Sequence, residues 1–210
     1  MAHIPDGVLS VPVIVGGGVV TVSALGWSLK KIDDNDLPKA AVVAALFFVA
    51  SLVNIAVGPT TVHLLLSGLM GLVIGWATVP AVFIALVLQA VFFGFGGIST
   101  LGVNTMNIAL PGVFWAMVFA PLVRRSAESP GRVAVLGAVV AALAVLTTAL
   151  LVAAVLALSD LAYVASAKVV LVTYIPLIAG EALIVGFASG FLARVKPDLF
   201  WFRRAKDTYV

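Results

Sequence analysis

The chain consists of long apolar runs that are interrupted only by short stretches of charged residues, glycine or proline. A helix that crosses the hydrocarbon core of a bilayer needs about 20 residues, and most of the runs approach or exceed this length. The pattern predicts an all-α integral membrane protein, a seven-transmembrane-helix bundle that forms a single domain over residues 1–210. The predicted helices cover residues 8–29, 38–57, 62–77, 79–95, 104–123, 132–158 and 168–194.

The composition excludes a water-soluble protein. Hydrophobic residues make up 63% of the chain and charged residues 10%, and the mean hydropathy is +1.23. Soluble domains are roughly 45–50% apolar and about 25% charged. Because the chain contains no cysteine, a transition-metal site would have to be built from nitrogen and oxygen donors.

The positive charges predict how the helices are oriented. Lysine and arginine concentrate in cytoplasmic loops of membrane proteins. Here they flank the first and fifth predicted connections and fill the tail, which predicts an extracellular amino terminus and a cytoplasmic tail over residues 195–210 in the cell (plasma or inner) membrane. The net charge of +3 is then a matter of topology, and no nucleic-acid partner is expected. The basic residues in question are Lys30, Lys31, Lys39, Arg124, Arg125, Arg132, Arg194, Lys196, Arg203, Arg204 and Lys206.

Two histidines are the main candidates for chemistry. His3 lies in the amino-terminal segment, residues 1–10, and His63 begins the third predicted helix on the same outer side of the membrane. Each could be a hydrogen-bonded structural residue. Alternatively, a terminal amine, backbone amide nitrogens and an imidazole can enclose one metal ion in fused chelate rings, and planar nitrogen coordination favours Ni²⁺, Co²⁺ or Cu²⁺ over Zn²⁺, Mg²⁺ or Ca²⁺.

The number of donors depends on the first two residues. If Met1 is removed, the Ala2 amine, the His3 amide nitrogen and the His3 ring supply three donors, and His63 is the available fourth. If Met1 is retained, its amine, two amide nitrogens and the His3 ring already fill a square plane, so His63 becomes redundant. Both arrangements remain open from the residues alone.

Other polar residues stand out within or beside the apolar runs. Ser99, Thr100, Asn104 and Asn107 could form a polar shell that orients a ligating histidine, or they could cap a helix. Glu181 is the one carboxylate well inside a predicted span. It could lie on a proton or metal path, or it could make a structural hydrogen bond.

Three separated motifs resemble the substrate-binding (S) component of cobalt and nickel energy-coupling factor (ECF) transporters, the CbiM/NikM family. They are residues 3–10 (HIPDGVLS), 61–64 (TVHL) and 93–104 (FGFGGISTLGVN), and the resemblance runs from Met1 to about Lys196. It implies that the metal is held by the amine of the terminal residue, by the amide and ring of His3, and by His63. Family members usually begin Met-His, whereas this chain begins Met-Ala-His, so the register of the site depends on removal of Met1.

The resemblance also implies a function and partners. The expected protein is a non-catalytic subunit that captures Co²⁺ or Ni²⁺ outside and delivers it to the cytoplasm. Its expected partners are a transmembrane coupling (T) component, two cytoplasmic ATP-binding subunits and a small accessory membrane subunit. The rival hypothesis is a proton-coupled secondary carrier that uses Glu181.

Overall fold

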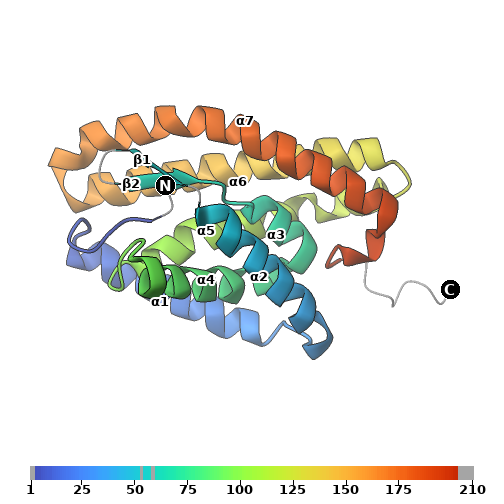
Figure 1. Cartoon of the computed structure of the whole chain (residues 1–210), viewed down its shortest axis with the longest axis horizontal. Coiled ribbons are helices and arrows are strands. Elements are labelled where there is room, and N and C mark those ends of the chain that lie inside the picture. The colour runs from blue at the N-terminus through green and yellow to red at the C-terminus, as the bar shows by residue number, and fades with distance from the viewer. Residues whose placement is uncertain (1–2, 53, 58–59, 203–210) are drawn as a thin grey trace.

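The computed structural model describes residues 3–52, 54–57 and 60–202, and these residues form a helical bundle with one small β-hairpin (Figure 1). The hairpin lies near the amino-terminal segment. The α-helices are α1 (Val11–Leu29), α2 (Leu37–Leu52), α3 (Ser67–Ile74), α4 (Thr78–Phe93), α5 (Leu101–Arg125), α6 (Pro130–Ser159) and α7 (Val164–Val195), and the strands are β1 (Asn54–Val57) and β2 (Thr60–His63).

The hairpin corrects the second and third predicted helices. The sequence predicts helix over residues 38–57 and again from residue 62, but α2 ends at Leu52 and α3 begins at Ser67. Strands β1 and β2 pair antiparallel between these ends, with Asn54 opposite His63. The prediction followed apolarity alone, whereas this stretch is rich in β-branched residues, which favour strands over helices.

Five helical segments of the described chain are long and apolar enough to cross a membrane: Val11–Leu29, Ser67–Phe93, Leu101–Arg125, Pro130–Ser159 and Leu161–Val195. Helix α2 is apolar but has only 16 residues. Many large apolar side chains on the outside of the bundle, such as Val19, Phe92 and Phe187, are exposed, as expected where a helix faces lipid. The protein is a multi-pass membrane protein.

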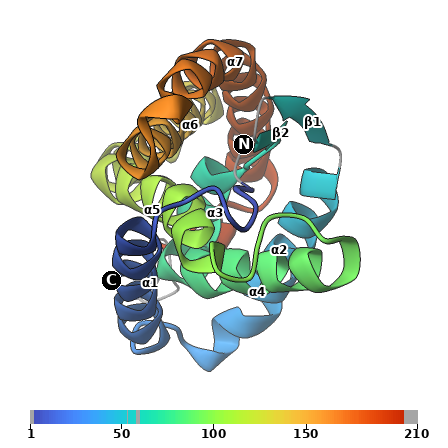
Figure 2. The ribbon, with the colours of Figure 1, turned by 90° about the vertical axis from the view of Figure 1, so that its left-hand side faces the viewer.

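Helix α3 lies at the centre of the bundle. Every residue of α3 is buried, and an end-on view shows the helix surrounded by the others (Figure 2). A 3₁₀ turn, Gly75–Ala77, joins it to α4, and Gly75 has a φ of 53°, a left-handed value that favours glycine. The sequence placed a boundary between its third and fourth helices at this point, and the turn accounts for it.

Small residues allow α3 to pack closely against α5. A Cβ atom added at Gly71 would overlap the backbone of Gly112, and one added at Gly112 would overlap the backbone of Ser67. Such contacts between helix backbones are typical of membrane helices, where small residues permit close approach. The fold thereby fixes α3, and the residues just before it, in the middle of the protein.

Candidate metal centre

The structure brings the two histidines together. His63 ends strand β2, and His3 lies in the segment that precedes α1. Their ring centroids are 4.7 Å apart, with an angle of 31° between the ring planes, and the two residues are 2% and 3% exposed. The Nε2 atom of each ring is buried and has no hydrogen-bond partner within the described chain. Each ring therefore has a buried nitrogen without a partner among the described residues, and the two rings lie side by side.

Asn104 and Thr100 hold the backbone next to His3. The Asn104 side chain accepts a hydrogen bond from the Ile4 N–H at 3.0 Å and donates one to the Ile4 carbonyl at 3.1 Å. The Thr100 hydroxyl donates to the same carbonyl at 2.6 Å. Because both backbone polar groups of this buried residue have partners, the cost of removing them from water is offset and the segment can lie inside the bundle.

Asp6 fixes the same segment further along. Its carboxylate accepts hydrogen bonds from the backbone N–H groups of Ile98 at 3.2 Å and of Ser99 at 2.9 Å, and from the Ser99 hydroxyl. The Ser99 hydroxyl contributes most to lowering the pKa of Asp6 below its usual value. A side chain at Gly97 would collide with Asp6, so glycine is required where the two segments meet.

Apolar neighbours and burial set the charge state of the pair. The ring of Phe95 lies 6.3 Å from the His3 ring, and that of Phe47 lies 6.2 Å from the His63 ring. Burial lowers the pKa of His3 to about 4, because a charged imidazolium loses its hydration in such surroundings. At neutral pH the His3 ring is therefore uncharged and can offer a lone pair to a metal ion.

His63 also has a defined orientation. Its Nδ1 atom lies 2.7 Å from the carbonyl oxygen of Leu64, and a carbonyl can only accept, so this contact requires the proton on Nδ1. The lone pair is then on Nε2. A metal-binding histidine typically donates its other N–H to a carbonyl or carboxylate in this way.

The described side chains alone do not complete a metal site. No group of three or more histidine, cysteine, aspartate or glutamate residues that could hold a metal occurs among them. Met1 and Ala2, the other predicted ligands, lie outside the described residues. The described chain places the two imidazole rings, and the other predicted donors are backbone and terminal nitrogen atoms.

The remaining predicted site residues differ in what they contact. Ser99, Thr100 and Asn104 support the His3 segment through the hydrogen bonds given above. Asn107 is buried, and its side chain has no hydrogen-bond partner in the described part of the chain. The backbone carbonyl oxygen of Asn107 accepts a hydrogen bond from the Thr148 hydroxyl at 2.8 Å. Glu181 accepts hydrogen bonds from the backbone N–H groups of Leu65 and Leu66, which lie two and three residues beyond His63.

Asp6 was missed by the sequence analysis. The signal was present, since Asp6 is the only charged residue in the first motif, and a charge next to an apolar helix needs a partner. Its partners could not be found from the sequence, because they are backbone groups more than 90 positions away.

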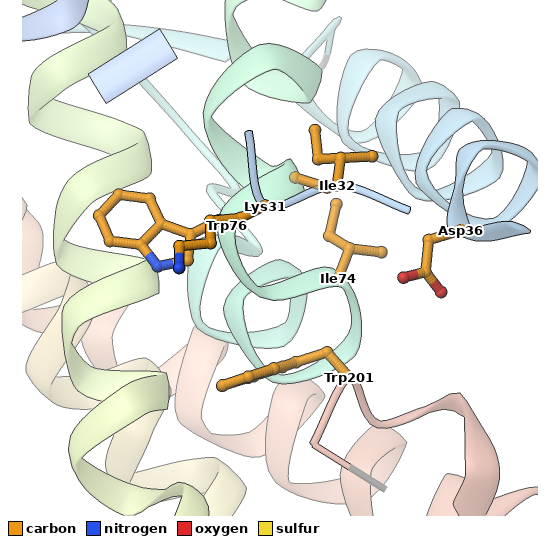
Figure 3. Close-up of a pocket in the computed structure, with 7 residues that line it drawn as sticks. Lys31, Ile32, Asp36, Ile74, Trp76 and Trp201 are labelled. Atoms are coloured by element: carbon orange, nitrogen blue, oxygen red, sulfur yellow. The ribbon is translucent and has the colours of Figure 1, made fainter. Parts of the chain in front are cut away.

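A hollow at the other end of α3 is separate from the histidines. Ile74, Trp76 and Ala77 line it with Trp201 from the carboxyl-terminal segment and with residues from the connection between α1 and α2 (Figure 3). The Trp201 N–H donates a hydrogen bond to the Leu72 carbonyl at 3.2 Å, which holds the tail segment against α3. The two ends of α3 thus contact different parts of the protein.

Comparison with known proteins identifies the family. Residues 3–199 match the model described as the cobalt uptake substrate-specific transmembrane region, CbiM. A Methanocorpusculum labreanum protein named CbiM 1, a candidate cobalt transport protein, is 33% identical over 211 residues, which cover 94% of this chain and 91% of that protein. The fused nickel transport protein NikMN of Rhodobacter capsulatus is 39% identical over 159 residues, which cover 73% of this chain and 46% of the fusion protein.

A solved structure agrees. The crystal structure of a transition metal transporter matches with a TM-score of 0.72 and 26% identity, covering 92% of this chain and 93% of that one. The chain spans about half the length of the R. capsulatus protein and of a Haemophilus influenzae relative that is 43% identical. The family match, however, takes in nearly the whole described bundle, and the chain belongs to the CbiM family of cobalt-uptake substrate-specific membrane proteins.

Proposed function

We propose that this protein is the substrate-binding subunit of an ATP-driven ECF importer, and that it captures Co²⁺ or Ni²⁺ at the extracellular face. The observation that carries this proposal is the buried pair His3 and His63, with ring centroids 4.7 Å apart, and the Nε2 atom of His63, which has no hydrogen-bond partner among the described residues. Buried polar atoms normally have partners. A bound metal ion would supply one to His63 Nε2.

The proposed coordination uses four nitrogen donors. They are the amine of Ala2 after loss of Met1, the amide nitrogen of His3, Nδ1 of the His3 ring and Nε2 of His63. Nδ1 is the His3 ring atom that can reach the same ion as the amide nitrogen of that residue. Removing a hydrated divalent cation from water is costly, and a cage of this kind replaces its water ligands while a deprotonated amide offsets part of the charge. The uncharged state of the His3 ring at neutral pH supports this arrangement.

The proposed orientation places the histidine end outside. All seven helices cross or enter the plasma membrane, with the tail and the connections after α1 and α5 in the cytoplasm, because these connections carry the basic residues. A T component, two ATP-binding subunits and a small accessory membrane subunit would then drive inward release. Relatives named for cobalt and nickel transport support this assignment of the substrate.

The direct test is the metal content of the purified protein together with the mass of its amino terminus. We expect about one Co²⁺ or Ni²⁺ per chain on a protein that begins at Ala2, and loss of most of it in His63→Ala. Ser189→Ala is the matched control, because Ser189 is buried and polar but lies far along the chain from either histidine motif. A metal-free protein that begins at Ala2, or full metal content in His63→Ala, would contradict the four-donor site.

A proton-coupled carrier would require Glu181 to exchange protons along a path. The hydrogen bonds that its carboxylate accepts from Leu65 and Leu66 favour a supporting role instead. Vesicles that contain this protein without ATPase partners should therefore show no proton-driven Co²⁺ or Ni²⁺ uptake. Uptake that depends on a proton gradient and is lost in Glu181→Gln would overturn the importer proposal in favour of the carrier.

A further inference from the structure

Glu181 lies in the long helix α7, far from His63 in sequence, yet its carboxylate contacts the short loop that follows His63. The Oε1 atom accepts a hydrogen bond from the Leu65 N–H and another from the Leu66 N–H at 2.9 Å, and Oε2 lies 3.1 Å from the Leu66 nitrogen. Glu181 is fully buried. A buried carboxylate needs such donors, and these two leave little freedom to the loop.

One peptide group, between Leu64 and Leu65, connects the Glu181 carboxylate to the His63 ring. The Leu65 N–H and the Leu64 carbonyl belong to the same planar peptide group, and the described chain contains no cis peptide, so the N–H and C=O point in opposite directions. Glu181 accepts from one side of this group, and on the other side the Leu64 oxygen lies 2.7 Å from His63 Nδ1. A continuous chain of hydrogen bonds thus connects α7 to the histidine ring.

The local backbone has a reason to need this support. Leu66 has a φ of 49° and is the one non-glycine residue of the described chain with a positive φ. A branched side chain is disfavoured in this left-handed region, at a cost on the order of 1 kcal/mol. Leu66 is also the residue that precedes the first turn of α3, where an anion is stabilised by the exposed N–H groups and by the helix dipole.

We propose that Glu181 is a positioning residue for metal capture: through the Leu64–Leu65 peptide it keeps the His63 proton on Nδ1 and presents Nε2 to the ion. This inference rests on the proposed function, because it assumes that His63 binds the metal. It assigns Glu181 a role in which its carboxylate touches neither the metal nor a transport path. Mutation of a residue that holds a ligating histidine in this way commonly lowers the metal affinity about 10- to 100-fold.

The first experiment measures the His63 ring in the metal-free protein. The chain has only two histidines, so long-range ¹H–¹⁵N spectra of the protein in detergent micelles can be assigned with His3→Ala and His63→Ala. The wild-type protein should show His63 protonated on Nδ1 and unprotonated on Nε2. A wild-type spectrum with the proton on Nε2 would overturn the proposal without any variant of Glu181.

The second experiment compares the affinities of Glu181 variants for Co²⁺ and Ni²⁺. Glu181→Leu removes both acceptor oxygens and should weaken binding about 10- to 100-fold, with the His63 spectrum shifting to a mixture of tautomers. Glu181→Gln keeps one acceptor oxygen and should recover most of the affinity and of the wild-type spectrum. Ser189→Ala, a buried polar change on the same helix, should alter neither.

The outcomes separate this inference from the proposed function. If His63→Ala abolishes binding but Glu181→Leu keeps wild-type affinity or the wild-type His63 spectrum, the positioning role is overturned while the metal site stands. If His63→Ala binds as the wild type does, the four-donor site fails. The tautomer of wild-type His63 still tests the hydrogen-bonded chain in that case.

Discussion

At the level of single residues, the amino-terminal segment is held inside the bundle by side chains from the start of α5 and the loop before it. Asn104 and Thr100 form hydrogen bonds with the backbone N–H and carbonyl of Ile4, and Asp6 accepts hydrogen bonds from backbone N–H groups of that loop. These contacts place His3 beside His63. In the proposed site, a segment held in this way would lower the entropic cost of binding.

Asn104→Ala should weaken Co²⁺ and Ni²⁺ binding about tenfold or more, because it leaves the buried Ile4 N–H without its acceptor, at a cost of roughly 1–3 kcal/mol. The Ile4 carbonyl keeps its hydrogen bond from Thr100. Asn107→Ala is the matched control. Asn107 is equally buried, but its side chain has no partner in the described chain, so affinity should change less than about twofold. Equal losses in the two variants, measured by titration calorimetry, would contradict the assigned role of Asn104.

Asp6→Ala should weaken metal binding by about three- to tenfold, since it removes a charged acceptor from an exposed position. The loss should appear as faster metal release, because the segment that carries His3 is held less firmly. Stopped-flow dissociation into a chelator would measure this rate. Glu128→Ala, which removes an exposed acid from the connection after α5, should leave the rate unchanged, and an unchanged rate in Asp6→Ala would count against the anchoring role.

The sequence identified His3 and His63 because histidine is rare in this chain and chemically distinctive. It also indicated Ser99, Thr100 and Asn104, polar residues in an apolar setting, but not which backbone groups they would contact. Asn107 shows the limit of that reasoning: it is also an asparagine near the start of α5, yet its side chain makes no hydrogen bond to Ile4 or to any other described residue. Only the three-dimensional packing separates the two asparagines.

At the level of elements, α3 has an unusual position for so short a helix. It has eight residues, all buried. It begins directly after the loop that follows His63, and its other end contacts the tail segment around Trp201. Its central place could not be predicted from the sequence, because its apolarity lies within the range of the other candidate membrane spans. The β-hairpin was missed for a related reason, since Ile55 and Val57 fit an apolar helix as well as a strand.

Gly71→Ala should destabilise the protein by about 1–3 kcal/mol, because the added methyl group would overlap the Gly112 backbone and push α3 from α5. Gly26→Ala in α1 is the matched control, as nothing lies within 4 Å of the added Cβ. Thermal unfolding in detergent should show a lower melting temperature for Gly71→Ala only. Equal melting temperatures for the two variants would mean that the close α3–α5 contact contributes little.

At the level of the whole molecule, the helical class and the membrane location could be predicted from the sequence. Both depend on composition and not on how the helices are arranged. Orientation rests on the basic residues, which the fold collects at one end of the bundle, away from the histidines. The proposed orientation would place the histidine end outside and the tail in the cytoplasm. An importer would then capture and release the ion on opposite sides of the membrane.

Cysteine labelling tests the orientation cleanly, because the natural chain has no cysteine. Leu161 lies at the start of the turn before α7 and is 84% exposed, whereas Glu128 lies between α5 and α6. Each of the two is replaced by cysteine in a separate variant. A membrane-impermeant maleimide should label Leu161→Cys in intact cells and Glu128→Cys only in inverted vesicles. The reverse pattern would place the histidines on the cytoplasmic side.

X-ray absorption spectroscopy of the cobalt- or nickel-loaded protein tests the central claim most directly, because it reports the atoms around the ion itself. The account predicts a first shell made of nitrogen, with scattering from two imidazole rings in the wild type and from one in His63→Ala. A wild-type spectrum with a single imidazole, identical to that of His63→Ala, would contradict capture of the metal between His3 and His63.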